Sequence, residues 1–377
     1  MMEISSKAEL VRKRRKSGLI VWDAGVGENK YPCSRTFMHL IQKYAHKKND
    51  SLLAGIDGLA EQVKTMYYPR PFRILFGNGM KELLFVAQMA FRGTIVHITP
   101  SCNYYYKQLA CLRKVSTLVE IHTSYVAGWK VSPEELDHVF ESISGPKMLL
   151  FNNPNNPTSV VYSVSEVESL AAICHRHDVV VLADEMYSKL AEPFVSMATY
   201  LPCIRGSSIS KDLAAGGCHL GWLAFPHKYK LFAERCFCFA STLCSSASPS
   251  VQYALRDFLS LPNAYDRYCS EMRQVYFEKT GHICSRLRES TRLHFVPTQA
   301  AWYLFLNFYA YKTELRNIGV ESSEELCSVV LDEIGLVCVH GDAFRTPSPL
   351  CVRLSLVDFE EMDNGVTRLI VWLRKLE

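Results

Sequence analysis

Four features that could take part in chemistry follow one another along the chain, each near the end of an apolar run. The turn GNGMKELL offers free backbone N–H groups at residues 79–81, a geometry that binds phosphate. Asn156 stands in the stiff turn NPNNP, Asp184 ends VVVLAD, and Lys211 follows SSIS. A lysine amine can act as nucleophile and base, and an acid that ends an apolar run needs a positive partner. Each feature alone is an ordinary loop residue, but four in this order indicate an active site.

The segments that would position these side chains alternate between strand and helix patterns. Short β-rich runs cover residues 94–100, 147–154, 179–187, 206–210 and 220–225. Amphipathic helical stretches separate them, and in one of these Ser165 and Glu168 have the spacing of a capping box. Strands that alternate with helices predict a mainly parallel sheet with helices on both faces. In such sheets, ligands bind at the carboxyl ends of the strands.

The pattern changes near residue 265, where a long helix is followed by strands mixed with helices. A chain of 377 residues, of which 48% are hydrophobic, exceeds the usual size of one domain. We therefore expect an α/β fold in which a large domain has a mainly parallel sheet flanked by helices, with a smaller α+β domain beside it. The expected division is an N-terminal arm with part of the small domain at 1–40, the large domain at 41–264 and the C-terminal small domain at 265–377.

Composition and charge argue against several classes of function. The formal net charge is only +4, and five basic residues are concentrated at 12–16, so nucleic acid is not expected as a partner. No apolar run is long enough to predict a membrane span. The 14 cysteines include no C-x-x-C pair, which favours reduced thiols in a cytoplasmic compartment. Cys174, His175 and His177 have no matching ligands elsewhere in the sequence, so no metal site is expected.

Motifs across nearly the whole chain are similar to those of one enzyme family. They are GVGENKYP, GNGMKE, PSCNYYY, NPNNPTS, DEMY, SISK, GCHLGW, PTQAAWYLF, GLVCVHGDAF and VRLSL. With these motifs in this order, the chain resembles the fold-type I pyridoxal-phosphate enzymes, in particular the class I and II aminotransferases, with features of histidinol-phosphate aminotransferase. The resemblance implies the type I aspartate aminotransferase fold and pyridoxal 5'-phosphate as the cofactor.

The resemblance also assigns roles to individual positions. It implies that Lys211 forms a Schiff base with the cofactor and then moves the substrate α-proton. Asp184 would pair with the pyridinium nitrogen, while Asn156 and Tyr187 would bind the 3-oxygen of the ring. The other cofactor contacts that it implies are Ser208, His219, Gly79, Met80, Lys81 and Cys102. The substrate α-carboxylate contacts that it implies are Arg353, Gly27 and Asn156, with the arginine supplying two parallel donors.

Four positions around the cofactor depart from the family pattern. His219 replaces an arginine, which stays charged at every working pH and offers two donors to a phosphate. Cys102 occupies the position of an aromatic residue that commonly stacks on the ring. Leu53 replaces a phosphate-binding tyrosine of the other subunit, and Ser159 replaces a glycine. Because the catalytic lysine Lys211 and its neighbours are retained, these changes predict a working but specialised enzyme with weaker phosphate anchoring.

Three functions stay open from the sequence. The first is an aminotransferase that moves an amino group between an amino acid and a 2-oxo acid, in a homodimer with active sites near the subunit interface. The second is another pyridoxal-phosphate reaction on an amino acid, namely decarboxylation, elimination or cyclisation. The third, a non-catalytic relative, ranks last, because a decayed site should have lost Lys211 or Asp184 first. No nucleic-acid or membrane partner is expected for any of them.

Overall fold

A seven-stranded sheet forms the centre of the larger part of the fold. The computed structural model describes residues 4–112 and 116–377. In spatial order, the strands are β2 (Arg73–Gly77), β8 (Gly221–Phe225), β7 (Ile204–Ser208), β6 (Val180–Asp184), β5 (Lys147–Asn152), β3 (Gly93–Thr99) and β4 (Ser116–His122). Strand β8 is antiparallel to both of its neighbours, whereas β7, β6, β5, β3 and β4 pair in parallel. The predicted α/β fold with a mainly parallel sheet is therefore confirmed.

Helices cover both faces of this sheet. They include α4 (Met80–Ala90) and α9 (Lys230–Leu243) on one face, and α6 (Pro133–Ser142) and α7 (Val164–Arg176) on the other. Neighbouring strand residues alternate between the two cores, so that Ile95 and Leu150 pack on the α4 side, while Val96 and Leu149 pack on the α7 side. Each such side chain, when fully buried, contributes about 1.5–3 kcal/mol. This two-sided burial explains why the strands are continuous apolar runs.

Helix α7 begins two residues earlier than the capping pattern predicted. Ser163 is its N-cap, with extended backbone angles, and its hydroxyl accepts a hydrogen bond from the backbone N–H of Glu166. The carboxylate of Glu166 accepts a hydrogen bond from the backbone N–H of Ser163 in return. The expected Ser165–Glu168 box is therefore wrong, because Ser165 already lies inside the first turn, where its backbone is helical.

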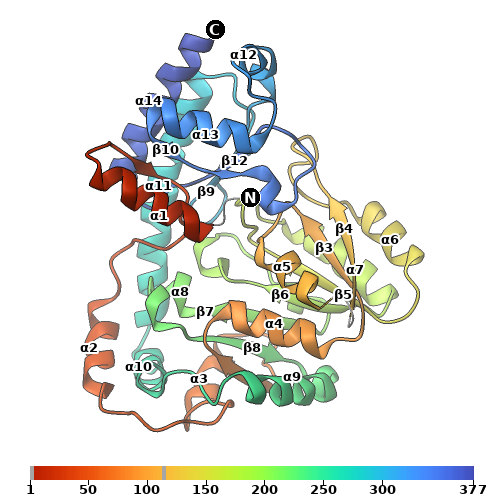
Figure 1. Cartoon of the computed structure of the whole chain (residues 1–377). Helices are drawn as coiled ribbons and strands as arrows, with labels where there is room; N and C mark the ends of the chain where they lie inside the picture. The colour runs from red at the N-terminus through yellow and green to blue at the C-terminus, as the bar shows by residue number, and fades with distance from the viewer. Residues whose placement is uncertain (1–3, 113–115) are drawn as a thin grey trace.

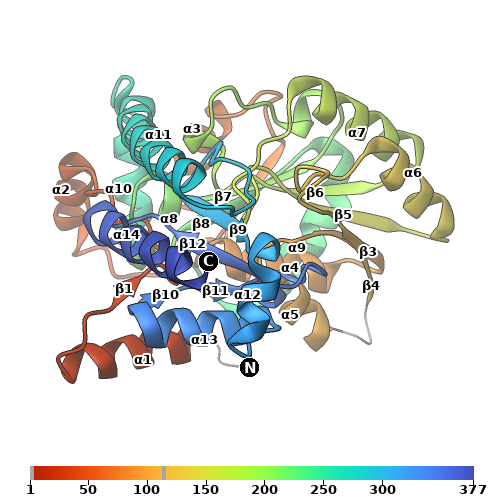
Figure 2. The ribbon, with the colours of Figure 1, turned by 90° about the horizontal axis from the view of Figure 1, so that it is seen from above.

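The smaller part of the fold contains an antiparallel sheet and several helices. The sheet has the order β11 (Val339–His340), β12 (Cys351–Ser355) and β9 (Tyr303–Asn307). Its helices are α11 (Ala264–Ser290), α12 (Lys312–Asn317), α13 (Ser323–Ile334) and α14 (Phe359–Leu376). The first part of the chain joins them, because β1 (Trp22–Asp23) pairs with β10 (Leu336–Val337), and α1 (Ile4–Lys16) lies beside α13 (Figure 2).

The remaining helices connect these parts. They are α2 (Arg35–Tyr44), α3 (Leu59–Thr65), α5 (Tyr104–Cys111), α8 (Ile209–Asp212) and α10 (Pro249–Leu259). Helix α2 packs on α10, and both lie at the same end of the molecule as α3 (Figure 1). Across residues 4–112 and 116–377, no helix combines the length and the apolar character needed to cross a membrane.

Candidate active site

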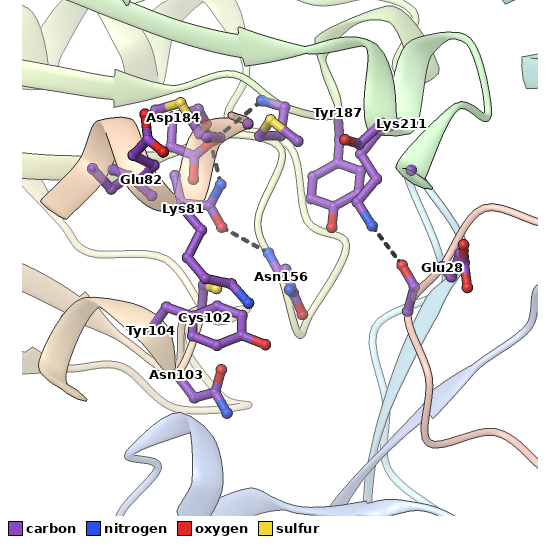
Figure 3. Close-up of a pocket in the computed structure, with 18 of the residues that line it drawn as sticks. Glu28, Lys81, Glu82, Cys102, Asn103, Tyr104, Asn156, Asp184, Tyr187 and Lys211 are labelled. Atoms are coloured by element: carbon purple, nitrogen blue, oxygen red, sulfur yellow. Dashed lines mark hydrogen bonds between the residues drawn. The ribbon is translucent and has the colours of Figure 1, made fainter. Parts of the chain in front are cut away.

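A cavity of about 750 Å³ lies at the carboxyl ends of the parallel strands, next to the smaller sheet. The residues predicted from the sequence that line it are Lys211, Asp184, Tyr187, Asn156, His219, Gly79, Met80, Lys81, Cys102, Arg353 and Gly27. They come from both sheets and from the segment that follows β1. Figure 3 shows Tyr187 and Lys211 side by side on the side of Glu28, with Lys81 and Tyr104 across the cavity. The side chain of Ser208 is fully buried and does not line the cavity.

Lys211 projects from the short helix α8, which directly follows β7. Its Nζ donates a hydrogen bond to the backbone carbonyl of Gly27, at 2.6 Å. The same ammonium lies 5.6 Å from the centre of the Trp302 ring. An amine in this position is half-buried and close to the cavity wall. Within the described residues, Nζ makes one hydrogen bond, so a ligand that binds Nζ has only this contact to replace.

Asp184 ends strand β6 and is buried, with 6% of its surface exposed. Its Oδ2 accepts a hydrogen bond from the hydroxyl of Tyr105 at 2.5 Å, and its Oδ1 accepts one from the backbone N–H of Met186 at 3.3 Å. Burial raises the pKa of this carboxyl to about 6, against the lowering effect of the Tyr105 hydroxyl. A positively charged group of a ligand beside Asp184 would lower that pKa again. The ionised carboxylate would then bind the charged group.

Arg353 is oriented by two fixed acceptors at the other side of the cavity. Its Nη1 donates to Oδ1 of Asn156 at 3.1 Å, and its Nη2 donates to the carbonyl of Gly25 at 2.7 Å. Its Nε is buried and has no hydrogen-bond partner among the described residues. Because a guanidinium presents donors in a planar fork, this arrangement can bind a carboxylate with two hydrogen bonds.

The loop between β2 and α4 forms the part of the cavity that fits a phosphate. Gly79 is the N-cap of α4, with a φ of 92° that favours glycine, and the free N–H groups of the first turn follow it. His219 comes just before β8. Because β8 is antiparallel to β7, the beginning of β8 lies at the same edge of the sheet as the end of β7, and His219 therefore lines the cavity. The hydroxyl of Ser208 accepts from the backbone N–H of Ser210, and of these two serines it is Ser210 that lines the cavity.

Cys102 lines the same cavity as Asp184 and the start of α4. Burial raises the pKa of its thiol to about 11, so the group is neutral at physiological pH. The neighbouring aromatic side chains take other positions, since Tyr105 bonds to Asp184 and Tyr104 stacks below Lys81, whose Nζ lies 3.8 Å from the ring centre. Cys102 therefore leaves more space in the cavity than an aromatic side chain would.

Several contacts of the site were not predicted from the sequence. Tyr105 is the hydrogen-bond partner of Asp184, Ser210 lines the cavity next to Lys211, and Tyr303 bonds to Tyr187. The run SSIS already contained Ser210, and a helical turn after β7 would have brought it to the cavity. No sequence signal distinguishes Tyr105 from Tyr104 or Tyr106, because which ring points inward depends on where α5 begins.

Asp212 gives the apo-protein a testable pH dependence. It is buried beside Lys211, its Oδ2 accepts hydrogen bonds from Ser207 and Tyr265, and burial raises its pKa to about 6. Between the ordinary carboxyl pKa and about 6, the unfolded chain is ionised while the folded carboxyl keeps its proton, so the wild type loses stability as the pH rises through this window. Relative to wild type, Asp212→Asn should therefore gain about 2 kcal/mol in the free energy of unfolding between about pH 4.5 and about pH 8.

Urea denaturation of both proteins at the two pH values measures this difference. The control is Asp50→Asn, which removes an exposed carboxylate instead of a buried one. An Asp212→Asn curve parallel to that of wild type would mean that the Asp212 carboxyl ionises as freely in the fold as in the unfolded chain.

Comparisons with known proteins agree with this geometry. A family model described as aminotransferase class I and II matches residues 25–369. An aspartate aminotransferase of Pinus pinaster is 30% identical over 298 residues, which are 76% of this chain and 59% of that protein. This chain thus spans less than two thirds of the length of the pine protein. A probable aspartate/prephenate aminotransferase of Aquifex aeolicus is 26% identical, and the match covers 98% of this chain and 94% of that protein.

A solved structure shows the same fold. It is an aspartate aminotransferase from Thermotoga maritima, which superposes with a TM-score of 0.85 at 22% identity and covers 99% of this chain and 98% of that one. At this level of identity the likeness establishes the fold, a parallel sheet flanked by helices with a smaller antiparallel sheet beside it.

Proposed function

We propose that this chain, which belongs to the class I and II aminotransferase family, is a pyridoxal-phosphate-dependent aminotransferase. Its reaction would be the transfer of an amino group between an amino acid and a 2-oxo acid. The observation that carries this proposal is the convergence of Lys211, Asp184 and Arg353 on one cavity. An amine, a buried acid and a fork of donors are the groups needed to hold the cofactor and an α-carboxylate together.

The residues of the cavity fit pyridoxal phosphate. A protonated ring nitrogen is the positive partner that the buried Asp184 needs, and Asn156 and Tyr187 would hold the ring's 3-oxygen. The N–H groups at the start of α4, together with Ser210 and His219, would hold the phosphate. When bound, the cofactor supplies an electron sink for the substrate's α-carbon.

The chain's own residues would orient the substrate and move its proton. Arg353 binds the α-carboxylate, and Asn156 keeps the guanidinium in place by accepting from its Nη1. Nζ of Lys211 would take the proton from the substrate's α-carbon and deliver it to the carbon on the other side of the transferred nitrogen, because a positioned lysine amine can act as a base. The neutral thiol of Cys102 does not compete with Lys211 as a nucleophile.

The visible spectrum of the purified protein with pyridoxal phosphate tests the proposed function. The spectrum is recorded before and after adding single amino acids without any oxo acid. The expected result is conversion of the cofactor to its amine form, which a 2-oxo acid then reverses. The amino acid that causes the conversion is the amino donor. Product release with the cofactor unchanged would instead support decarboxylation, elimination or cyclisation, and failure to bind the cofactor would contradict both readings.

Replacing His219 with arginine is expected to lower the dissociation constant of pyridoxal phosphate about threefold to tenfold. Residue 219 is exposed, has a φ of 45° and lines the cavity. An arginine there would offer a permanently charged pair of donors where histidine offers one donor that depends on pH. Equilibrium dialysis at about pH 8 measures the change. His138→Arg, on the exposed surface of α6, is the matched control, and equal affinities for the two variants would contradict a phosphate contact by residue 219.

The assembly and location of the enzyme are further parts of the proposal. We propose a homodimer in the cytoplasm, with the chain divided into an arm, a large domain and a small domain near residues 40 and 264. Exposed apolar side chains between α2 and β2 support a dimer, since Leu52 is 75% and Tyr68 is 84% exposed. Light scattering of the purified protein tests it, and a monomer at micromolar concentration would contradict it.

A further inference from the structure

Tyr303 contacts three separate parts of the candidate site. It is the first residue of β9 in the smaller sheet, and only 1% of it is exposed. Its Oη lies 2.8 Å from Oη of Tyr187 and 3.3 Å from the carbonyl oxygen of Gly27. Its ring faces the guanidinium of Arg353, whose Cζ lies 4.6 Å from the ring centre. One side chain thus touches the loop after β6, the segment after β1 and the proposed carboxylate-binding arginine.

The backbone of Tyr303 is fixed to the loop that carries Asn156. Its N–H donates a hydrogen bond to the hydroxyl of Ser159 at 3.1 Å. Ser159 is fully buried and has a φ of 56°, a conformation that costs energy for a residue other than glycine. At this position, where the family resemblance implies glycine, serine provides an acceptor that glycine lacks, and this acceptor ties the first residue of β9 to the loop.

The close approach of the Tyr303 hydroxyl to Gly27 depends on the absence of a side chain there. A Cβ at position 27 would lie 2.4 Å from Oη of Tyr303, which real side chains do not tolerate. Glycine at 27 therefore lets the hydroxyl of Tyr303 sit between the segment after β1 and Tyr187. Any larger residue would push the hydroxyl away from both partners.

Either hydroxyl can donate in the hydrogen bond between Tyr187 and Tyr303, and Tyr303 can also donate to the carbonyl of Gly27. A separation of 2.8 Å is typical of an O–H···O hydrogen bond, whereas 3.3 Å is longer than the usual range. The carbonyl of Gly27 also accepts the shorter hydrogen bond from Lys211. When a ligand oxygen accepts the proton of Tyr187, Tyr303 is the remaining donor for the 2.8 Å hydrogen bond, and it gives up its longer contact with the carbonyl of Gly27.

We infer that Tyr303 is a positioning residue, whose hydroxyl holds Tyr187 so that the Tyr187 proton points at the 3-oxygen of bound pyridoxal phosphate. This inference rests on the proposed function. Two hydrogen bonds in series strengthen one another, so the donation from Tyr303 makes Tyr187 a better donor. The face of the Tyr303 ring has a second and separable effect, because it packs on Arg353 whether or not the hydroxyl is present.

The test is a pH titration of the visible absorbance of the protein loaded with pyridoxal phosphate. With Tyr303→Phe, the midpoint should rise by about half to one pH unit, because a less stabilised ring oxygen holds the shared proton more tightly. The Michaelis constant for the amino acid should stay within about twofold of wild type, since phenylalanine keeps the ring over Arg353. Tyr303→Leu should shift the midpoint and also raise the Michaelis constant.

A double-mutant cycle shows whether the effect passes through Tyr187. Tyr187→Phe alone should raise the midpoint, and adding Tyr303→Phe to it should cause no further shift. Tyr311→Phe is the matched control, because Tyr311 is a buried tyrosine of the same part of the fold whose hydroxyl accepts from Arg292, away from the cavity. Gly27→Ala, which displaces the Tyr303 hydroxyl without removing it, should shift the midpoint in the same direction as Tyr303→Phe.

The outcomes separate this inference from the function on which it rests. If wild type and variants alike fail to develop a visible band with pyridoxal phosphate, the proposed function is wrong and the inference falls with it. If wild type titrates normally and Tyr303→Phe has the same midpoint, the inference alone is wrong. A Tyr303→Phe shift that persists in full on the Tyr187→Phe background would also overturn it, because the hydroxyl would then act by a route other than Tyr187.

Discussion

Lys211→Ala should reduce turnover by at least about 10⁴-fold and abolish covalent retention of pyridoxal phosphate. Helix α8 directs this amine into the cavity, where its Nζ is 2.6 Å from the carbonyl of Gly27 and its side chain lies beside Tyr187 (Figure 3). Loss of the amine removes both the group that would attach the cofactor and the base that would move the substrate proton. The visible band of the bound cofactor and the rate of amino transfer are the two measurements.

A second cavity lysine provides the control for this prediction. Lys81 also lines the cavity, but its ammonium lies over the ring of Tyr104, across from Lys211 (Figure 3). After reduction with borohydride, peptide mass analysis should place the cofactor on Lys211 in wild type and in Lys81→Ala, and should find none in Lys211→Ala. An adduct on Lys81 in wild type would transfer the proposed role to that residue. Partial rescue of Lys211→Ala by methylamine would show that the lost group acts as a base.

Much of the fold follows from features that are local in the sequence. The runs that contain Leu149 and Leu182 are apolar on both faces, which is the pattern of a parallel strand covered by two layers of helices. The glycine-rich turn correctly predicted the start of α4, because Gly79 adopts a backbone conformation that favours glycine. Such signals depend on neighbouring residues only, and they can be recognised without knowing the tertiary structure.

Positions inside a local pattern are harder to fix. The segment SVSEVE contains two overlapping Ser-x-x-Glu pairs, and only the backbone angles decide that Ser163 and not Ser165 is the N-cap. Likewise, Ser208 and Ser210 are two residues apart at the end of β7, and the beginning of α8 decides which of them reaches the cavity. A shift of one or two residues changes the side-chain direction completely while leaving the composition of the segment the same.

Contacts between distant parts of the chain carry no signal in a single sequence. Tyr105 and Asp184 are 79 positions apart, and Tyr187 and Tyr303 are 116 positions apart, yet both pairs are hydrogen-bonded. The sequence could place Asp184 at a strand end, but it could not reveal that a tyrosine from α5 lies against it. The second pair depends in addition on how the smaller sheet packs against the larger one, which no local pattern describes.

Arg353→Lys is expected to have a large effect on substrate binding. The catalytic efficiency, kcat/KM, should fall about 100-fold, mainly through a higher KM for the amino acid and for the oxo acid. A lysine keeps the positive charge but cannot donate to Asn156 and Gly25 and still present two parallel donors to a carboxylate. Steady-state kinetics with both substrates measure this change, and the affinity for pyridoxal phosphate should be nearly unaffected.

The arrangement around Arg353 makes this prediction specific to the shape of the side chain rather than to its charge. Both terminal nitrogens are held by fixed acceptors, so the plane of the guanidinium, and not its charge alone, sets where a carboxylate can bind. Arg345→Lys is the matched control, because Arg345 is an exposed arginine of the same part of the fold that pairs with Glu120. An Arg353→Lys variant with wild-type KM and a lower kcat would contradict a binding role, because a carboxylate contact made equally in substrate and transition state changes KM first.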